Sequence, residues 1–136
     1  MQGPEEYPVI GIAELDEEHR LLAAALRDLV AAVKEDDAGR CTTFAHALLE
    51  RAAAHFQHEE RLMGEVHFAF RARHQLAHEL FLEQARQNLE EMQANGLSRS
   101  SLQWISETLE WFRSHVVKED IALARAIRTV RTVPAD

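Results

Sequence analysis

The sequence is poor in cysteine, proline and glycine. Cys41 is the only cysteine, so no disulfide can form within the chain, and a cytoplasmic setting fits this best. Three prolines and five glycines among 136 residues leave few positions that would interrupt a helix. Together with a hydrophobic content of 46%, this predicts a globular, largely helical domain with a buried core.

Long apolar runs and positive charge are also scarce. No run approaches the roughly 18 apolar residues that cross a bilayer, so no membrane insertion is expected. The acidic segment of residues 1–6 does not have the character of a signal peptide. The 15 lysines and arginines are outnumbered by 23 aspartates and glutamates, which gives a net charge of −8. This balance argues against nucleic acid and anionic membrane surfaces as partners.

Four long segments carry the apolar repeat of amphipathic helices. Short loops between them make neighbouring helices antiparallel. The sequence therefore predicts an all-α protein, an up-down-up-down antiparallel four-helix bundle with an extended N-terminal arm. In this single domain of residues 1–136, the arm is residues 1–13 and the helices are expected at about residues 16–34, 42–63, 72–93 and 98–128.

The ends and inner faces of these helices follow from particular residues. Asp16 and Ser98 are favourable N-caps for the first and last helices. Asn95 and Gly96 form a strong stop for the third. The inward stripes are expected to contain Leu22, Leu26, Leu29, Val30 and Val33, then Phe44, Leu48, Ala52, Phe56 and Met63, then Leu76, Leu80, Ala85, Leu89 and Met92, and finally Leu102, Ile105, Leu109, Phe112, Val116, Leu123 and Ile127.

Eight histidines are many for a chain of this length, and five of them fall at one level of the expected bundle. Because neighbouring helices are antiparallel, His19 lies level with the segment between His55 and Glu59, and His78 lies level with Gln57. The last helix reaches the same level, so all four helices bring histidine to one layer within about one turn of 5.4 Å. Two carboxylates join them, and the layer contains His19, His55, Glu59, His74, His78, His115 and Asp120.

Five neutral imidazoles and two carboxylates are too many polar groups to bury without partners. They suit a borderline transition metal, and two ions better than one. With both carboxylates and one oxide or hydroxide bridging, the layer supplies about 11 of the about 12 contacts of two octahedral ions. A non-redox ion gains little from the position left open, whereas a pair of iron ions could bind dioxygen there.

Two of these patterns have simpler interpretations when each is taken alone. His55 and Glu59 have the spacing of a common surface pair on a helix. His74 and His78 have the spacing of a zinc protease motif, but Gln75 replaces the glutamate that acts as general base, which excludes that interpretation. The metal layer therefore depends on the register of the helices and not on either pair.

The least secure ligand on geometric grounds is Asp120. It follows His115 by five residues, which is about 140° around an ideal helix, whereas Glu119 lies at about 40°. Geometry alone favours Glu119, and a ligand at Asp120 needs a local distortion of the helix. Other polar or aromatic residues are expected outside the ligand set: His46 in solvent, His58 at the surface or beside a ligand, His67 in a loop, Glu60 in solvent or beside a ligand histidine, and Trp104 and Cys41 in structural positions.

Across about residues 9–123, these motifs resemble the hemerythrin family, specifically the single-domain bacterial hemerythrins. Two departures are His67-Phe68 in a connector and the lack of tryptophan in the arm. The motifs are Gly11-Ile12 with Leu15-Asp16-Glu17-Glu18-His19, then His55-Phe56 with Glu59-Glu60 and Leu62-Met63, then His74, His78 and Phe81, and last Trp111, His115 and Asp120.

The resemblance implies a centre of two iron ions with an oxo or hydroxo bridge. One iron would be held by three histidines, and the other by two histidines with one position open. Both carboxylates would bridge, and apolar side chains would wall the oxygen pocket and exclude water. In this sequence the first iron takes His74, His78 and His115, the second takes His19 and His55, the bridges are Glu59 and Asp120, and the walls are Phe56, Trp111, Phe112 and Val116.

The function that the resemblance implies is reversible dioxygen binding for storage, delivery or scavenging, with no enzymatic activity and an unknown protein recipient. Three alternatives stay open. One is a module that senses oxygen or redox state, and another is a di-iron oxidase, peroxidase or ferroxidase. The third is a structural bundle that binds zinc, which metal analysis distinguishes from the others.

Overall fold

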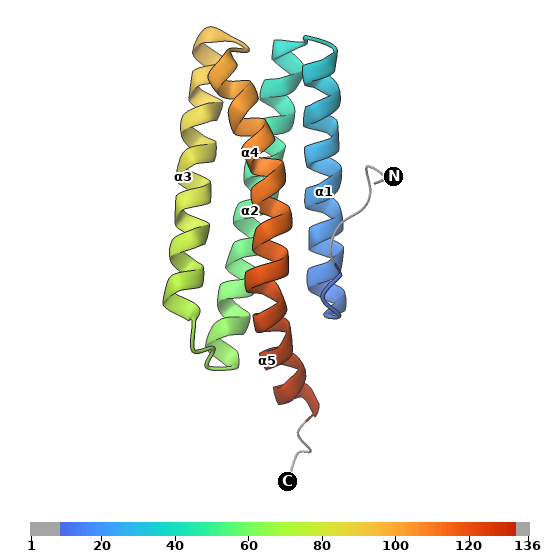
Figure 1. Ribbon diagram of the computed structural model, residues 1–136, viewed down its shortest axis with the longest axis vertical. Coiled ribbons are helices and arrows are strands. Elements are labelled where there is room, and N and C mark those ends of the chain that lie inside the picture. The colour runs from blue at the N-terminus through green and yellow to red at the C-terminus, as the bar shows by residue number, and fades with distance from the viewer. Residues whose placement is uncertain (1–8, 133–136) are drawn as a thin grey trace.

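Four helical rods pack side by side in an antiparallel, up-down-up-down bundle (Figure 1). The computed structural model describes residues 9–132, and these residues form no strand. The expected all-α bundle is therefore confirmed. None of the helices in this range is both long enough and apolar enough to cross a membrane. The elements are α1 (Ala13–Lys34), α2 (Ala38–Glu65), α3 (Arg71–Asn95), and a fourth rod made of α4 (Arg99–His115), the π-helix η1 (Val116–Asp120) and α5 (Ile121–Thr132).

The amino end of α1 is held by the preceding arm. The prediction that Asp16 is the N-cap is wrong, because Ile12 takes that position and the helix begins three residues earlier than expected. The carboxylate of Asp16 instead accepts hydrogen bonds from two arm amides, Ile10 N at 2.8 Å and Gly11 N at 3.1 Å. Ile10 and Ile12 are buried, so this part of the arm packs on the body as expected. The expected arm residues 1–8 lie outside the described residues.

Gly11 allows a cation from the far end of the chain to reach the arm. Its φ is +89°, and a Cβ there would lie 2.9 Å from Arg128 Nη1. The Arg128 guanidinium donates to Ile10 O at 2.6 Å. The start of α1 and the end of α5 are thus joined through the arm.

The loop between α1 and α2 is shorter than the sequence indicates. The prediction that α2 begins near residue 42 is wrong, because Asp37 is its N-cap and accepts a hydrogen bond from Arg40 N at 3.0 Å. The other two expected helix ends are present. Gly96, with φ 72°, ends α3, and Ser98 Oγ accepts a hydrogen bond from Ser101 N at 3.2 Å at the start of α4.

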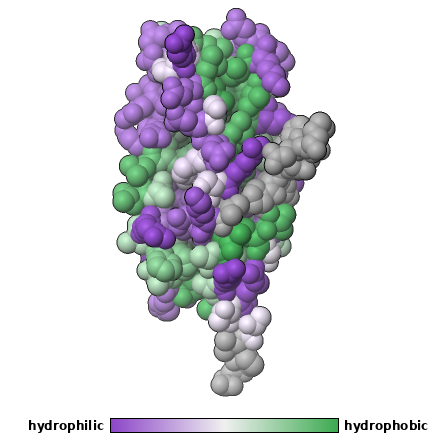
Figure 2. Space-filling model, in the orientation of Figure 1, coloured by the Kyte–Doolittle hydropathy of each residue, from purple (hydrophilic) through white to green (hydrophobic). Residues whose placement is uncertain are grey.

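Most of the expected apolar stripes are buried, but three leucines are not. Leu76, Leu80 and Leu102 are 53%, 58% and 43% exposed, so their predicted inward positions are wrong. On α3 the reason is that His74 and His78 face the core, and a residue two positions further along a helix points to the opposite side. Apolar surface is visible along the α3 side of the molecule (Figure 2). Val30, Val33, Phe44 and Leu109 are half-buried, and the side chain of Val116 lies outside the described part of the structure.

Candidate metal centre

The seven polar side chains of the expected layer meet inside the bundle. Each is at most 5% exposed. Their ligand atoms form two groups, and within each group the atoms lie within 4.8 Å of one another. Glu59 belongs to both groups. The first is Glu59, His74, His78 and His115, and the second is His19, His55, Glu59 and Asp120.

All four rods contribute to these groups. α1 supplies His19, and α4 supplies His115. α2 and α3 each supply a pair of residues four positions apart, which a regular helix presents on one face. The pairs are His55 with Glu59, and His74 with His78.

The π-helix η1 brings Asp120 to the same side as His115. Its hydrogen bonds run between residues five apart, so residues separated by five positions share a face. Asp120 Oδ1 consequently lies 3.0 Å from His115 Nε2, and both side chains are buried. Glu119, which a regular helix would favour, belongs to neither ligand group; it is half-buried and lies 3.9 Å from Arg73 and 4.0 Å from His74 Nδ1. The structure thus contains the helix distortion that a ligand at Asp120 requires.

Each of the two buried carboxylates faces both groups. Asp120 Oδ2 lies 2.9 Å from His19 Nε2, and its Oδ1 lies 3.1 Å from His74 Nε2. Glu59 Oε1 lies 3.5 Å from His55 Nε2 and 3.1 Å from His78 Nε2. These are the positions that carboxylates shared between two ions would take.

The histidines present Nε2 to the centre, and outer carboxylates fix two of the rings from behind. With the proton on Nδ1, His55 donates to Glu18 Oε1 at 2.6 Å, and His78 donates to Glu60 Oε2 at 3.0 Å. The other oxygen of Glu18 lies 2.6 Å from His58 Nδ1. Such contacts hold a ligand ring in the orientation and tautomer that metal binding needs.

The sequence interpretation did not identify Glu18 as part of this arrangement. The signal was available, because the register that brings His19 to His55 also places Glu18 level with the segment between His55 and His58. The side roles of Glu60 and His58, in contrast, were among the expected alternatives and are present.

Several buried polar atoms in the centre have no hydrogen-bond partner among the described residues. The imidazole Nε2 atoms and carboxylate oxygens approach to 3.0–3.6 Å, but these approaches do not have hydrogen-bond geometry. Leaving such atoms buried and unpaired is costly, and a cation placed between them would satisfy them together. These atoms are both Glu59 oxygens, Asp120 Oδ1, and the Nε2 atoms of His74, His78 and His115, and the Nδ1 atoms of His19 and His74 also have no partner.

Burial and mutual charge split the pKa values of the two carboxylates. Burial and the nearby charge of Asp120 raise the pKa of Glu59 well above its usual value. Burial acts in the same direction on Asp120, but the neighbouring imidazoles of His115 and His19, the second of which is hydrogen-bonded to Asp120 Oδ2, outweigh it and hold the pKa of Asp120 well below its usual value. The pKa values of the two buried carboxylates are therefore shifted in opposite directions.

The pKa values of two of the histidines are also shifted in opposite directions. Burial lowers the pKa of His55, but the carboxylates of Asp120 and Glu18 outweigh this effect and raise that pKa to about 10. Burial and the neighbouring imidazoles of His115 and His74 lower the pKa of His78 to about 2. His78 therefore presents a free nitrogen at neutral pH, whereas His55 carries a proton that a metal must displace.

We expect metal binding to release protons and to strengthen as the pH rises. His55, with a pKa of about 10, is protonated at neutral pH. As the pH rises toward that value, the proton competes less with the metal for the ring nitrogen. The apparent affinity should increase about tenfold per pH unit for each proton displaced. Titration of the metal-free protein with Co²⁺ at about pH 6, 7 and 8 measures this slope. An affinity that stays constant across that range would contradict the expectation.

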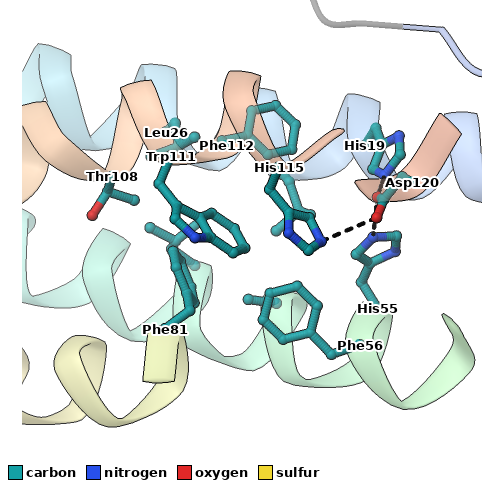
Figure 3. Close-up of a pocket in the computed structure, with 13 residues that line it drawn as sticks. His19, Leu26, His55, Phe56, Phe81, Thr108, Trp111, Phe112, His115 and Asp120 are labelled. Carbon is teal, nitrogen blue, oxygen red and sulfur yellow. Dashed lines mark hydrogen bonds and ion pairs between the residues drawn. The ribbon is translucent and has the colours of Figure 1, made fainter. Parts of the chain in front are cut away.

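A small apolar cavity adjoins one side of the centre. The centre of a water-sized molecule can occupy about 10 Å³ of this cavity. This is about the least space that holds one such molecule. Figure 3 shows His19, His55 and Asp120 at one end, with Phe81 and Thr108 at the other. Phe56, Trp111 and Phe112 are among its walls, together with Leu22, Leu26, Leu48, Ala52, Phe81 and Thr108, which the sequence interpretation did not assign to it.

Aromatic rings pack directly against three of the candidate ligands. Phe56 stacks on His78 with ring centroids 3.9 Å apart, and Trp111 stacks on His115 at 4.4 Å. The ring edge of Phe112 lies against His19 at 6.0 Å. These contacts keep the ligand rings in fixed positions and line the centre with apolar surface.

The remaining residues that the sequence singled out lie away from the centre. His46 is exposed and lies 3.1 Å from Glu50. His67 adopts a positive φ of 52° in the loop before α3. Trp104 and Cys41 are buried in the core, and burial raises the pKa of the Cys41 thiol.

A sequence model of the hemerythrin HHE cation-binding domain matches residues 10–127 of the chain. The matched range includes all seven side chains of the centre. No curated protein matches the chain significantly. The family match and the two buried groups together identify a cation-binding domain whose interior is suited to two metal ions.

Proposed function

The chain belongs to the hemerythrin family, and from this premise we propose that it binds dioxygen reversibly at a non-haem di-iron centre. In this proposal three histidines hold one iron and two hold the other. Glu59 and Asp120 would be the carboxylates that hold both ions. The three-histidine ion takes His74, His78 and His115, and the two-histidine ion takes His19 and His55.

The observation that carries the proposal is the match between an incomplete ligand set and an open space. The group around His19 and His55 has one histidine fewer than the group around His74 and His78. The apolar cavity is lined by His19, His55 and Asp120 of this group, whereas only His115 lines it among the three histidines of the other group. A small molecule in the cavity would therefore lie beside the ion that lacks a ligand.

The residues of the cavity favour reversible binding of dioxygen over an enzymatic reaction with it. Two ferrous ions, when bound, would supply the two electrons that reversible binding of dioxygen requires. Among the described residues that line the cavity outside the ligand set, Thr108 has the only hydroxyl group and none has a carboxyl group, and the Thr108 hydroxyl donates to Trp104 O at 2.7 Å. The walls thus exclude water and offer no free acid to a bound molecule, which disfavours oxidase or peroxidase chemistry.

The test is metal content combined with the visible spectrum. We expect two irons per chain and a colourless diferrous form that gains a visible absorption band in air and loses it on deoxygenation. A colour that does not reverse would contradict reversible binding. Steady turnover of peroxide or of iron(II) would favour an enzyme instead, and two zinc ions in place of iron would favour a structural bundle.

A further inference from the structure

We propose that dioxygen reaches the cavity through a groove between α3 and α4, and that Trp111 closes the inner end of this groove. The inference rests on the proposed function for the identity of the gas. The route itself is inferred from the side chains that line both the groove and the cavity.

The groove lies on the surface between the third and fourth rods. Its volume is about 540 Å³. Leu80 and Ala77 line it from α3, and Trp104 and Ser114 line it from α4. The exposure of Leu80 thus has a structural consequence, because this leucine forms an apolar wall of an open groove instead of packing in the core.

Three side chains line both the groove and the cavity: Phe81, Thr108 and Trp111. They therefore form a partition between the two hollows, and they lie at the end of the cavity away from Asp120 (Figure 3). The Phe81 and Trp111 rings are 4.4 Å apart and tilted by 31°. Trp111 is half-buried, so this partition is in contact with solvent on its outer side.

Trp111 is the part of this partition best placed to regulate passage. Its indole spans from the groove to the centre, where it stacks on His115 at 4.4 Å. Thr108 is held by its hydrogen bond to Trp104 O, and Phe81 is buried. Movement of the indole toward the groove, which has room for it, would join the two hollows.

A second hollow, of about 150 Å³, adjoins His55 from the other side and is less suited to the gas. Its walls include the charged side chains of Glu18 and Arg51. Glu18 is hydrogen-bonded to His55 and closes that approach. The α3–α4 groove also has charged walls, Glu107 and Glu110, so charge alone does not distinguish the two hollows. The groove shares three side chains with the cavity, whereas the second hollow shares only His55, whose ring is fixed by Glu18.

The test compares variants that open or fill each hollow. Trp111→Ala should raise both the association and the dissociation rates of dioxygen by about tenfold, because both directions use one route. Ala77→Trp fills the groove and should slow both rates by about tenfold. Leu21→Trp is the matched control in the second hollow and should leave both rates unchanged. Stopped-flow mixing and flash photolysis of the diferrous protein measure these rates.

Xenon exchange provides a readout that is independent of iron chemistry. In the zinc-loaded protein, ¹²⁹Xe magnetic resonance should show slower exchange for Ala77→Trp and unchanged exchange for Leu21→Trp. Xenon tests the route even if dioxygen does not bind reversibly, so failure of the route and failure of the proposed function are distinguishable. If Trp111→Ala does not fold, the two filling variants decide. Slowing by Leu21→Trp, or none by Ala77→Trp, would overturn the proposal.

Discussion

Replacement of Glu59 by glutamine is expected to abolish the binding of two metal ions. Glu59 is fully buried, belongs to both ligand groups, and has no hydrogen-bond partner for either oxygen. An amide offers one neutral oxygen where the carboxylate offers two charged ones, so both ions lose a ligand. We expect a loss of affinity of more than about a hundredfold, or about 2.7 kcal/mol. Metal analysis and competitive chelator titration measure it.

The same substitution should leave the metal-free protein intact. Because burial and the charge of Asp120 raise the pKa of Glu59, its protonated form is favoured, and glutamine matches that form in shape and charge. The Tm of the metal-free variant should therefore change by less than about 4 °C. Glu60→Gln is the matched control. It weakens the contact behind His78 and changes the partner of the Gln75 amide, but it removes no ligand atom. It should reduce affinity by about 10- to 100-fold while two ions still bind. Unchanged metal affinity in Glu59→Gln would refute the bridging role.

Asp120→Ala and Glu119→Ala should have very different effects although the residues are adjacent. Asp120 is buried and lies within 3.1 Å of His19, His74 and His115, so its loss removes a contact to both groups. The expected result is a loss of more than about a hundredfold in metal affinity, measured as for Glu59. In a regular helix the larger effect would belong to Glu119, so this pair of variants also tests the π-helix.

Glu119→Ala should retain two metal ions. Glu119 is 28% exposed on its side chain and lies 3.9 Å from Arg73 and 4.0 Å from His74 Nδ1. Exposed ion pairs of this length contribute at most about 1 kcal/mol, and the change in stability should stay within that value. Equal losses of metal in the two variants would mean that Asp120 has no special position.

The bundle and the shared layer were predictable from spacing alone. His55 with Glu59, and His74 with His78, are four residues apart, and antiparallel register places these pairs on one level. The prediction needs only the spacing of residues within each helix and the short loops between helices, and both can be recognised in a single sequence. Asp120 could be proposed only by resemblance, because five residues do not fit a regular helix, and the π-helix of η1 supplies the missing rotation.

The errors have a common physical origin, which is that contacts between distant segments override local preference. Asp16 has the character of an N-cap, but the arm amides of Ile10 and Gly11 bind its carboxylate inside the helix. Leu80 is apolar, but the histidines of α3 occupy the inner face and leave it outside. An assignment made one helix at a time places leucine in the core and histidine outside it. In α3 the histidines are in the core and Leu80 is exposed.

The hydrogen bond between His19 and Asp120 joins residues 101 positions apart in the sequence. Neither ligand group is complete until the fourth rod packs on the other helices, because one group needs Asp120 and the other needs His115. During synthesis the chain must therefore bring its helices together before it can hold either ion fully.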